Sequence, residues 1–218
     1  MYLFRAIVLI LVAGMSTGAA AQPLRFGSGI FGGINLSQVD GDDMQGYDKP
    51  GFNLGLRGIA YIIPKLEFHT ELAYSQRGSQ SKDFGKSNNK GRKLYLDYAS
   101  INALIVMNDW FHPIKEYYRL QVHGGISTGR LIRYQVNDPG SDVNSVQFNE
   151  LAHYFNSTDF SMIFGAHIKF TPKTGLSFRY SRSMNKLLDA DLVQPTNERK
   201  TVTSMKGYSI SCDFFYHF

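Results

Sequence analysis

The chain has 218 residues, and its composition excludes several kinds of protein. Lys and Arg outnumber Asp and Glu by 23 to 18, but the basic residues form no block of like charge, so nucleic-acid binding has little support. Cys212 is the only cysteine, which excludes an internal disulfide and any metal site built from several cysteines.

Residues 1–21 have the pattern of a secretory signal peptide. An apolar run over 6–13 follows Arg5, and it is too short to cross a bilayer, which takes about 20 residues. Small residues then precede the expected cleavage site, which is formed by Ala19, Ala21 and Gln22. We therefore expect an exported protein with a signal peptide over 1–21 and one domain over 22–218.

Beyond the signal, apolar and polar residues alternate with a period of two, as in β-strands whose two faces differ. The clearest runs are 160–170 and 208–218, in which every second residue is apolar. Weaker alternation brings the expected number of strands to eight, with the others near 24–36, 52–62, 66–74, 94–108, 117–131 and 176–180.

The segment over 94–108 changes parity. Its apolar residues lie on even positions from Leu94 to Tyr98 but on odd positions from Ile101 to Met107. We therefore expect a β-bulge near Ala99 or Ser100 that re-aims the side chains.

The breaks between these segments alternate in length. Short breaks lie near 64–65, 109–116 and 171–174, and long polar breaks lie near 39–49, 79–93, 132–158 and 185–203. Outer-membrane barrels alternate short periplasmic turns with longer extracellular loops in this way. The pattern predicts an all-β, eight-stranded, antiparallel up-and-down transmembrane β-barrel in the outer membrane of a Gram-negative cell, with both termini in the periplasm.

A soluble periplasmic carrier of the lipocalin type would alternate equally well, but with its apolar face turned inward. Three features favour the membrane: charge on the opposite face of nearly every strand, aromatic residues near strand ends, and an aromatic residue at the end of the chain.

Four segments resemble the PorT-like family of outer-membrane β-barrel domains. They are a glycine-rich first strand over 32–37, the end of a loop over 49–52, a third strand closing in Ser-Gln-Arg-Gly over 71–78, and the terminal strand over 208–218. Where such proteins often have Leu-Glu-aliphatic-Pro, this chain has Leu-Asp-Tyr-Ala over 96–99. The resemblance implies an outer-membrane barrel and, because a few members are linked to secretion and gliding machinery, a secretion component as one candidate partner.

The polar faces of the strands would line the lumen of such a barrel. An eight-stranded barrel is only wide enough inside for side chains, so each buried charge needs a partner. We expect a plugged lumen held by ion pairs and hydrogen bonds, with a proton or ion path as the functional alternative. The expected lumen residues are Arg57, Glu67, His69, Glu71, Arg77, Asp97, Arg119, His123, His167, Lys169, Arg179 and Asp213.

Glu67, His69 and Glu71 share one face of a strand and could form a metal or acid–base cluster. Any polar lumen strand has the same spacing, so we expect a structural role, with no metal and no cofactor. A lipid-modifying outer-membrane enzyme is the rival function, but the chain contains no His-x-Ser pair, G-x-S-x-G turn or phosphate-binding glycine loop.

The last strand and one connection are the remaining candidates for recognition. Tyr208, Phe214, Tyr216 and the terminal Phe218 share a face and resemble the strand that the barrel-assembly machinery reads; otherwise they are lipid-facing filler. The connection over 132–158 is unusually apolar, so it either packs against its neighbours or binds a protein partner at the cell surface. The sequence thus predicts a non-enzymatic protein in contact with outer-membrane lipid.

Overall fold

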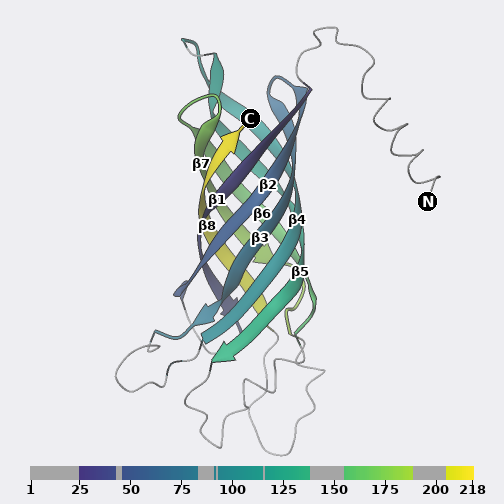
Figure 1. Ribbon diagram of the computed structural model, residues 1–218, viewed down its shortest axis with the longest axis vertical. Helices are drawn as coiled ribbons and strands as arrows, with labels where there is room; N and C mark the ends of the chain where they lie inside the picture. The colour runs from purple at the N-terminus through teal and green to yellow at the C-terminus, as the bar shows by residue number, and fades with distance from the viewer. Residues whose placement is uncertain are drawn as a thin grey trace, which may run out of the picture.

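The structure, a computed structural model, describes residues 25–42, 46–82, 91, 93–114, 116–137, 155–188 and 205–218. They form eight strands, each antiparallel to its neighbour in sequence, and β8 pairs with β1 to close the barrel (Figure 1). The predicted all-β, eight-stranded antiparallel barrel is confirmed. The strands are β1 Phe26–Asp40, β2 Lys49–Ile63, β3 Leu66–Gln80, β4 Lys93–His112, β5 Tyr117–Asn137, β6 Thr158–Lys169, β7 Thr174–Ser183 and β8 Lys206–His217.

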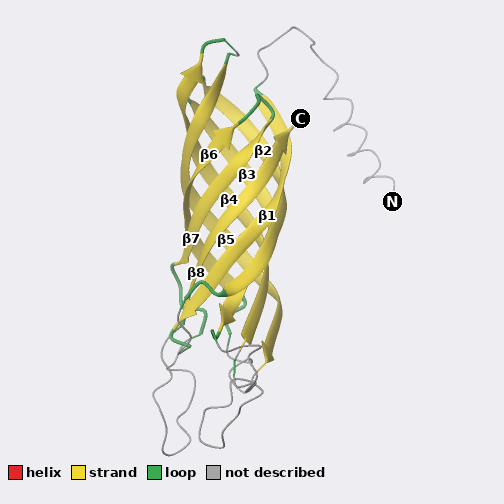
Figure 2. Cartoon of the chain, turned by 90° about the vertical axis from the view of Figure 1, so that its left-hand side faces the viewer, coloured by secondary structure: helices red, strands yellow, loops and turns green. Residues whose placement is uncertain are grey.

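The two ends of the barrel differ in their connections (Figure 2). The turn end carries the C-terminus and the short links over 64–65, 113–116 and 170–173, whereas the loop end carries the long links over 41–48, 81–92, 138–157 and 184–205. The expected alternation of short and long connections is therefore confirmed. The expected signal peptide, with Ala19, Ala21 and Gln22, lies outside the described residues. In the part of the chain that is described, no helix is long and apolar enough to cross a membrane.

The strands place their apolar face outward. Along β8, Ile210 and Phe214 are 46% and 50% exposed, whereas Asp213 and Phe215 between and beside them are fully buried. A continuous apolar wall of this kind is stable only against lipid, because water would penalise so large an exposed apolar surface. A soluble carrier of the lipocalin type would have the opposite arrangement.

A β-bulge lies close to the expected place, between β4 and β5 at Asp97–Tyr98, but the expectation that it re-aims the side chains of β4 is wrong. Strand β4 pairs with β3 in unbroken register, and its even-numbered residues are buried from Leu94 to Asn108. The only register shift in its pairing with β5 lies at Asp97–Tyr98, where Ile132 of β5 is the additional residue. The apolar pattern changes parity because the inside of the barrel changes from polar to apolar near the loop end.

Gly33 allows the barrel to close. A Cβ atom at this position would run into the main chain of Cys212 and Asp213 on β8, so a side chain here would push the two strands apart. The glycine in the first strand thus allows the close pairing of β1 with β8 that closes the barrel.

Strands β3, β4 and β5 extend together at the loop end, where Gln80 of β3 and Asn137 of β5 both pair with Lys93 of β4. Pairing between β5 and β6 stops at Arg130 and Thr158, but β5 continues to Asn137 while paired with β4. The connection expected over 132–158 is therefore shorter, because its first residues form a strand. Those after Asn137 are described only from Phe155 onward.

Candidate functional site

Glu71 is the centre of the charged part of the lumen. Its fully buried carboxylate accepts hydrogen bonds from Arg57 Nε at 2.9 Å and from the two terminal nitrogens of Arg179 at 2.7 and 2.8 Å. Asn102 donates a further hydrogen bond at 3.0 Å. Arg179 Nε also lies 3.8 Å from the Asp213 carboxylate, so two guanidiniums and two carboxylates balance one another inside the barrel.

Two inward-pointing aromatic rings lie against the guanidiniums. The Phe31 ring centre is 4.9 Å from the Arg179 guanidinium carbon and 5.4 Å from that of Arg57, and the Phe215 ring is 5.2 Å from that of Arg57. These contacts are cation–π interactions, which are stronger where water is excluded. The sequence assigned no role to Phe31, although its odd position on β1 places it on the same face as buried Asn35.

Glu67 organises a second polar layer nearer the turn end. One carboxylate oxygen lies 2.8 Å from His69 Nε2, and the other accepts hydrogen bonds from Asn108 at 2.8 Å and Gln121 at 3.2 Å. Gln121 Oε1 in turn lies 3.3 Å from His167 Nδ1. The layer joins strands β3, β4, β5 and β6 across the lumen.

Four histidine rings fill the space beside this layer. The ring centres of His123 and His167 are 4.2 Å apart, those of His167 and His69 are 5.9 Å apart, and those of His69 and His217 are 6.2 Å apart. Both ring nitrogens of His123 lack a hydrogen-bond partner among the described residues. No group of three His, Cys, Asp or Glu side chains within the described ranges could hold a metal ion, so Glu67, His69 and Glu71 do not form the metal cluster considered above.

The loop end of the lumen is filled by apolar side chains instead. We call this group the apolar plug; its buried members are Val39, Leu94, Leu96, Tyr98, Leu187, Leu188 and Met205. Leu187 and Leu188 come from the connection between β7 and β8, and Leu188 forms isolated β-bridges with Phe155 and Met205. Parts of two long connections thus close the barrel at this end.

Serine-rich walls separate the plug from the charged centre. Ser75, Ser100, Ser181, Ser209 and Ser211 border a cavity of only about 40 Å³. A space of this size holds about one water molecule and no larger solute. Along the described part of the lumen, the open volume is therefore small.

The remaining predicted lumen residues lie at different levels. Arg77 donates hydrogen bonds to Asp159 at 3.1 Å and to Ser75 at 2.8 Å, nearer the loop end. Lys169 and Asp97 are buried. Arg119 has the inward parity of β5 but lies at the exposed rim, where its guanidinium is 5.4 Å from the Trp110 ring centre. Arg119 therefore takes no part in the network around Glu71.

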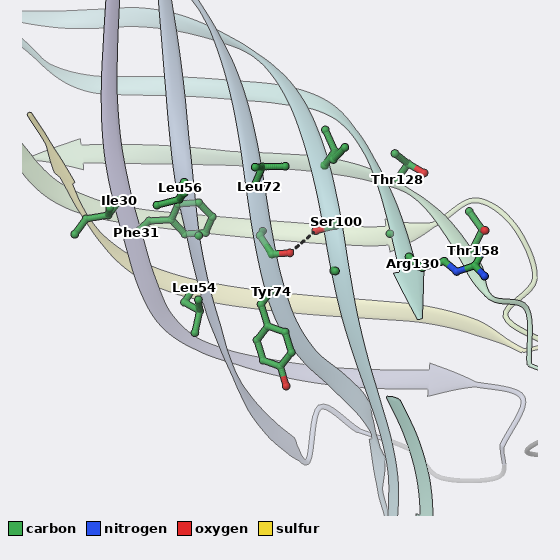
Figure 3. Close-up of a pocket in the computed structure, with 15 residues that line it drawn as sticks. Ile30, Phe31, Leu54, Leu56, Leu72, Tyr74, Ser100, Thr128, Arg130 and Thr158 are labelled. Atoms are coloured by element: carbon green, nitrogen blue, oxygen red, sulfur yellow. Dashed lines mark hydrogen bonds between the residues drawn. The ribbon is translucent and has the colours of Figure 1, made fainter. Parts of the chain in front are cut away.

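The outer wall carries a shallow groove of about 820 Å³ across strands β1 to β6 (Figure 3). Its sides are outward-facing apolar residues such as Leu54, Leu56, Leu72 and Ile101, which are 50% to 60% exposed. Arg130, Thr128 and Thr158 lie together at one end of it, as Figure 3 shows. The groove was not expected from the sequence, because every outward position along a strand has the same periodicity.

The residues of the expected assembly signal line the outer face of β8. Phe214 and the terminal Phe218 are 50% and 67% exposed, and the Tyr216 and Phe218 rings are 5.6 Å apart. The main-chain N–H of Phe218 donates to Ser28 at 2.9 Å, so the last residue is still attached to β1.

The family model for the outer membrane protein beta-barrel domain matches residues 7–218. The chain belongs to this family. It is therefore an outer-membrane β-barrel, and the loop end is the side that such barrels turn to the cell exterior. No curated protein matches the sequence significantly.

Several solved structures resemble this outer-membrane barrel at low sequence identity. Ail of Yersinia pestis, the attachment invasion locus protein, shares 14% identity, with 89% of this chain and 100% of Ail covered and a TM-score of 0.47. Neisserial surface protein A shares 16% identity over 88% of this chain and 97% of its own, with a TM-score of 0.43. OprG of Pseudomonas aeruginosa shares 12% identity over 88% and 96%, with a TM-score of 0.38.

Proposed function

We propose that the protein is a non-conducting, non-enzymatic barrel that anchors a binding surface on the outside of the cell. The observation that carries this proposal is the filling of the lumen at two separate levels. The pairs of Glu71 with Arg57 and Arg179 fill its middle, and the apolar plug closes its loop end. A pore would need both layers to open, whereas a scaffold benefits from the rigidity that both provide.

The extension of β3, β4 and β5 supports the binding part of the proposal. Beyond Arg130, strand β5 has no pairing with β6, although it continues to Asn137. The side chains of Ile132 and Tyr134 on this projection are 56% and 43% exposed. A rigid projection with exposed apolar groups is suited to contact a protein partner at the cell surface. The partner contact expected over 132–158 would then begin on a strand.

Conductance tests the closed lumen. Purified barrel in planar bilayers should give no channels above background, and a regular open state in the unmodified protein would refute the scaffold role.

Site-specific photo-cross-linking in cells tests the binding surface. A probe at Gln135, on the projection, should give an adduct with one discrete partner, whereas a control probe at Arg119, at the turn end, should not. Equal adducts at both sites, or none at Gln135, would contradict partner binding there.

The assignment to the PorT-like branch is a finer proposal. It is supported by the sequence segments over 32–37, 49–52 and 71–78, which all lie in β1, β2 and β3. On this assignment the surface partner would be a secretion component. Identification of the Gln135 adduct by mass spectrometry decides the point, because any partner outside a secretion or gliding system would remove the reason for the assignment.

Export and assembly are the last part of the proposal. We infer that residues 1–21 direct export and that Tyr208, Phe214, Tyr216 and Phe218 are read by the barrel-assembly machinery. Phe214, Tyr216 and Phe218 are exposed and Tyr208 is half-buried, and all four alternate along the outer side of β8 and the residue that follows it, which supports this role. Deletion of Phe218 should reduce the heat-modifiable band of folded barrel in membrane fractions, while Phe26→Ala, on the outer face of β1, should not. An undiminished band after the deletion would exclude the terminal signal.

A further inference from the structure

We propose that the outer-wall groove is a binding site for the phosphorylated glycolipid of the outer leaflet, with Arg130 contacting a phosphate and the apolar part of the groove holding an acyl chain. This site is on the lipid-facing side of the barrel and is independent of any partner bound at the loops.

Arg130 is a cation without a counter-charge among the described residues. It points outward from β5, and its exposed side chain forms no ion pair or hydrogen bond with any residue in the described ranges. Its neighbours in register are Ala99 and Thr158, neither of which is acidic. A charge on the lipid face is costly unless it reaches the interface and finds a partner there, and a phosphate of the lipid headgroup supplies such a partner.

The position of Arg130 places that partner in the outer leaflet. Thr158, directly opposite Arg130, is the first residue of β6 after the chain returns from a long connection. Arg130 is thus near the loop end, at the level where the headgroups of the outer leaflet lie. Thr158 lies next to the Arg130 side chain, and Thr128 lines the same end of the groove, so both can supply hydroxyl groups there (Figure 3). A guanidinium with neighbouring hydroxyl donors matches the oxygen atoms of a phosphate.

The groove continues from Arg130 toward Ile30 in the first half of β1. It crosses four strand spacings of about 4.8 Å, roughly 19 Å in all, which is comparable with an extended acyl chain. Because the strands are tilted, a row that begins near the loop end on β5 reaches the middle of the wall on β1. A chain in the groove would therefore run from the headgroup level into the membrane.

Ala99 keeps the groove open. It is the outward residue between Tyr74 on β3 and Arg130 on β5, and larger side chains line the groove on both sides. Acyl chains are as apolar as the rest of the wall, so the groove can favour a bound chain only through the fit of its shape. The contact between Arg130 and a phosphate favours lipids with a phosphorylated headgroup. The two contributions can be removed separately by substitution.

The experiment measures lipid retained by the purified full-length barrel in neutral detergent, by native mass spectrometry. The probes are diphosphoryl lipid A, the same lipid A after enzymatic dephosphorylation, and phosphatidylglycerol. The variants are Arg130→Gln, which removes the charge, and Ala99→Leu, which fills the groove. The matched controls are Arg182→Gln, which changes an arginine stacked on Tyr208 of β8, and Ala103→Leu, on the same face of β4 outside the groove.

Unmodified protein should retain diphosphoryl lipid A in preference to the dephosphorylated lipid and phosphatidylglycerol. Arg130→Gln should lower that preference about fivefold, the effect of one basic residue at an anionic headgroup layer. Ala99→Leu should reduce retention of both forms of lipid A, and the controls should change retention less than twofold. All variants must show the heat-modifiable band, which confirms folding.

Three results would overturn the site. Equal retention of the dephosphorylated lipid by the unmodified protein would remove the phosphate contact. Equal losses with Arg130→Gln and Arg182→Gln would mean that any interfacial arginine suffices. Retention of phosphatidylglycerol as strong as that of lipid A would mean that the wall binds anionic lipid in general and that no glycolipid site exists.

Discussion

The two halves of the lumen are filled in opposite ways. Toward the turn end, Glu71 and Glu67 hold layers of charged, amide and histidine side chains beside a small apolar cluster of Leu104, Val106 and Ile163. Toward the loop end the apolar plug is the larger part of the filling, and the Arg77–Asp159 ion pair lies next to it. The charged half depends on exact partners, because one unpaired charge there is expensive. The plug depends on volume, because apolar contacts have no required partner and lose stability in proportion to the space left empty. Substitutions should therefore affect the two halves by different mechanisms and by different amounts.

Glu71→Gln should have the largest effect. The side chain keeps its shape but loses the charge that pairs Arg57 and Arg179, and two buried guanidiniums are left with Asp213 alone. We expect a loss of about 3–5 kcal/mol in the free energy of unfolding. Denaturant titration followed by the fluorescence of Trp110, the only tryptophan, measures it. Glu116→Gln, at an exposed turn position, is the matched control. A loss below about 1 kcal/mol would mean that buried water solvates the two guanidiniums in place of the carboxylate.

Leu188→Ala should cost less, about 2–3 kcal/mol, because it removes a fully buried side chain from the apolar plug and leaves a cavity. The same titration measures the loss. The variant should still give no channels in planar bilayers, because the layer around Glu71 remains in place. Channels in this variant alone would show that the plug by itself keeps the barrel closed.

Arg77→Gln tests the boundary between the two halves. Its ion pair with Asp159 is 3.1 Å long, and the Arg77 side chain is 17% exposed. A partly hydrated pair of this kind contributes about 1 kcal/mol or less, and salt weakens it. The difference in the free energy of unfolding between this variant and the unmodified protein should therefore shrink as ionic strength rises. A loss as large as that of Glu71→Gln would place Arg77 in the buried charged network.

Tyr98→Phe should have the smallest effect and the opposite sign. The Tyr98 hydroxyl is buried in the apolar plug and has no hydrogen-bond partner among the described residues. Removing an unsatisfied buried hydroxyl should leave stability unchanged or raise it by up to about 1 kcal/mol. Thermal unfolding of the two proteins side by side measures the difference. A clear destabilisation would reveal a polar partner for this hydroxyl.

The sequence by itself determined the class of fold. Perfect alternation over 160–170 and 208–218, together with short and long breaks in turn, is sufficient for an antiparallel barrel, because side chains of a strand alternate strictly between its faces. The same rule placed Glu67, Glu71, Arg57 and Arg179 on inward positions before their partners were known. Alternation reports which face a residue occupies, and nothing about its level along the barrel axis.

Only the tertiary structure decided which side chains contact one another inside the barrel. The register of β2, β3 and β7 brings Arg57 and Arg179 to Glu71, although Arg179 is 108 positions away in the chain. From the sequence, the apolar residues of the plug on β4 looked like a change of parity at Ala99. The sequence of one strand does not show that the lumen becomes apolar where Leu187 and Leu188 fold back into it. Arg119 has the right parity but lies at the exposed rim, where its guanidinium lies over the Trp110 ring instead of joining the network around Glu71. Period-two patterns are local, whereas pairing and depth depend on the tilt and closure of all eight strands.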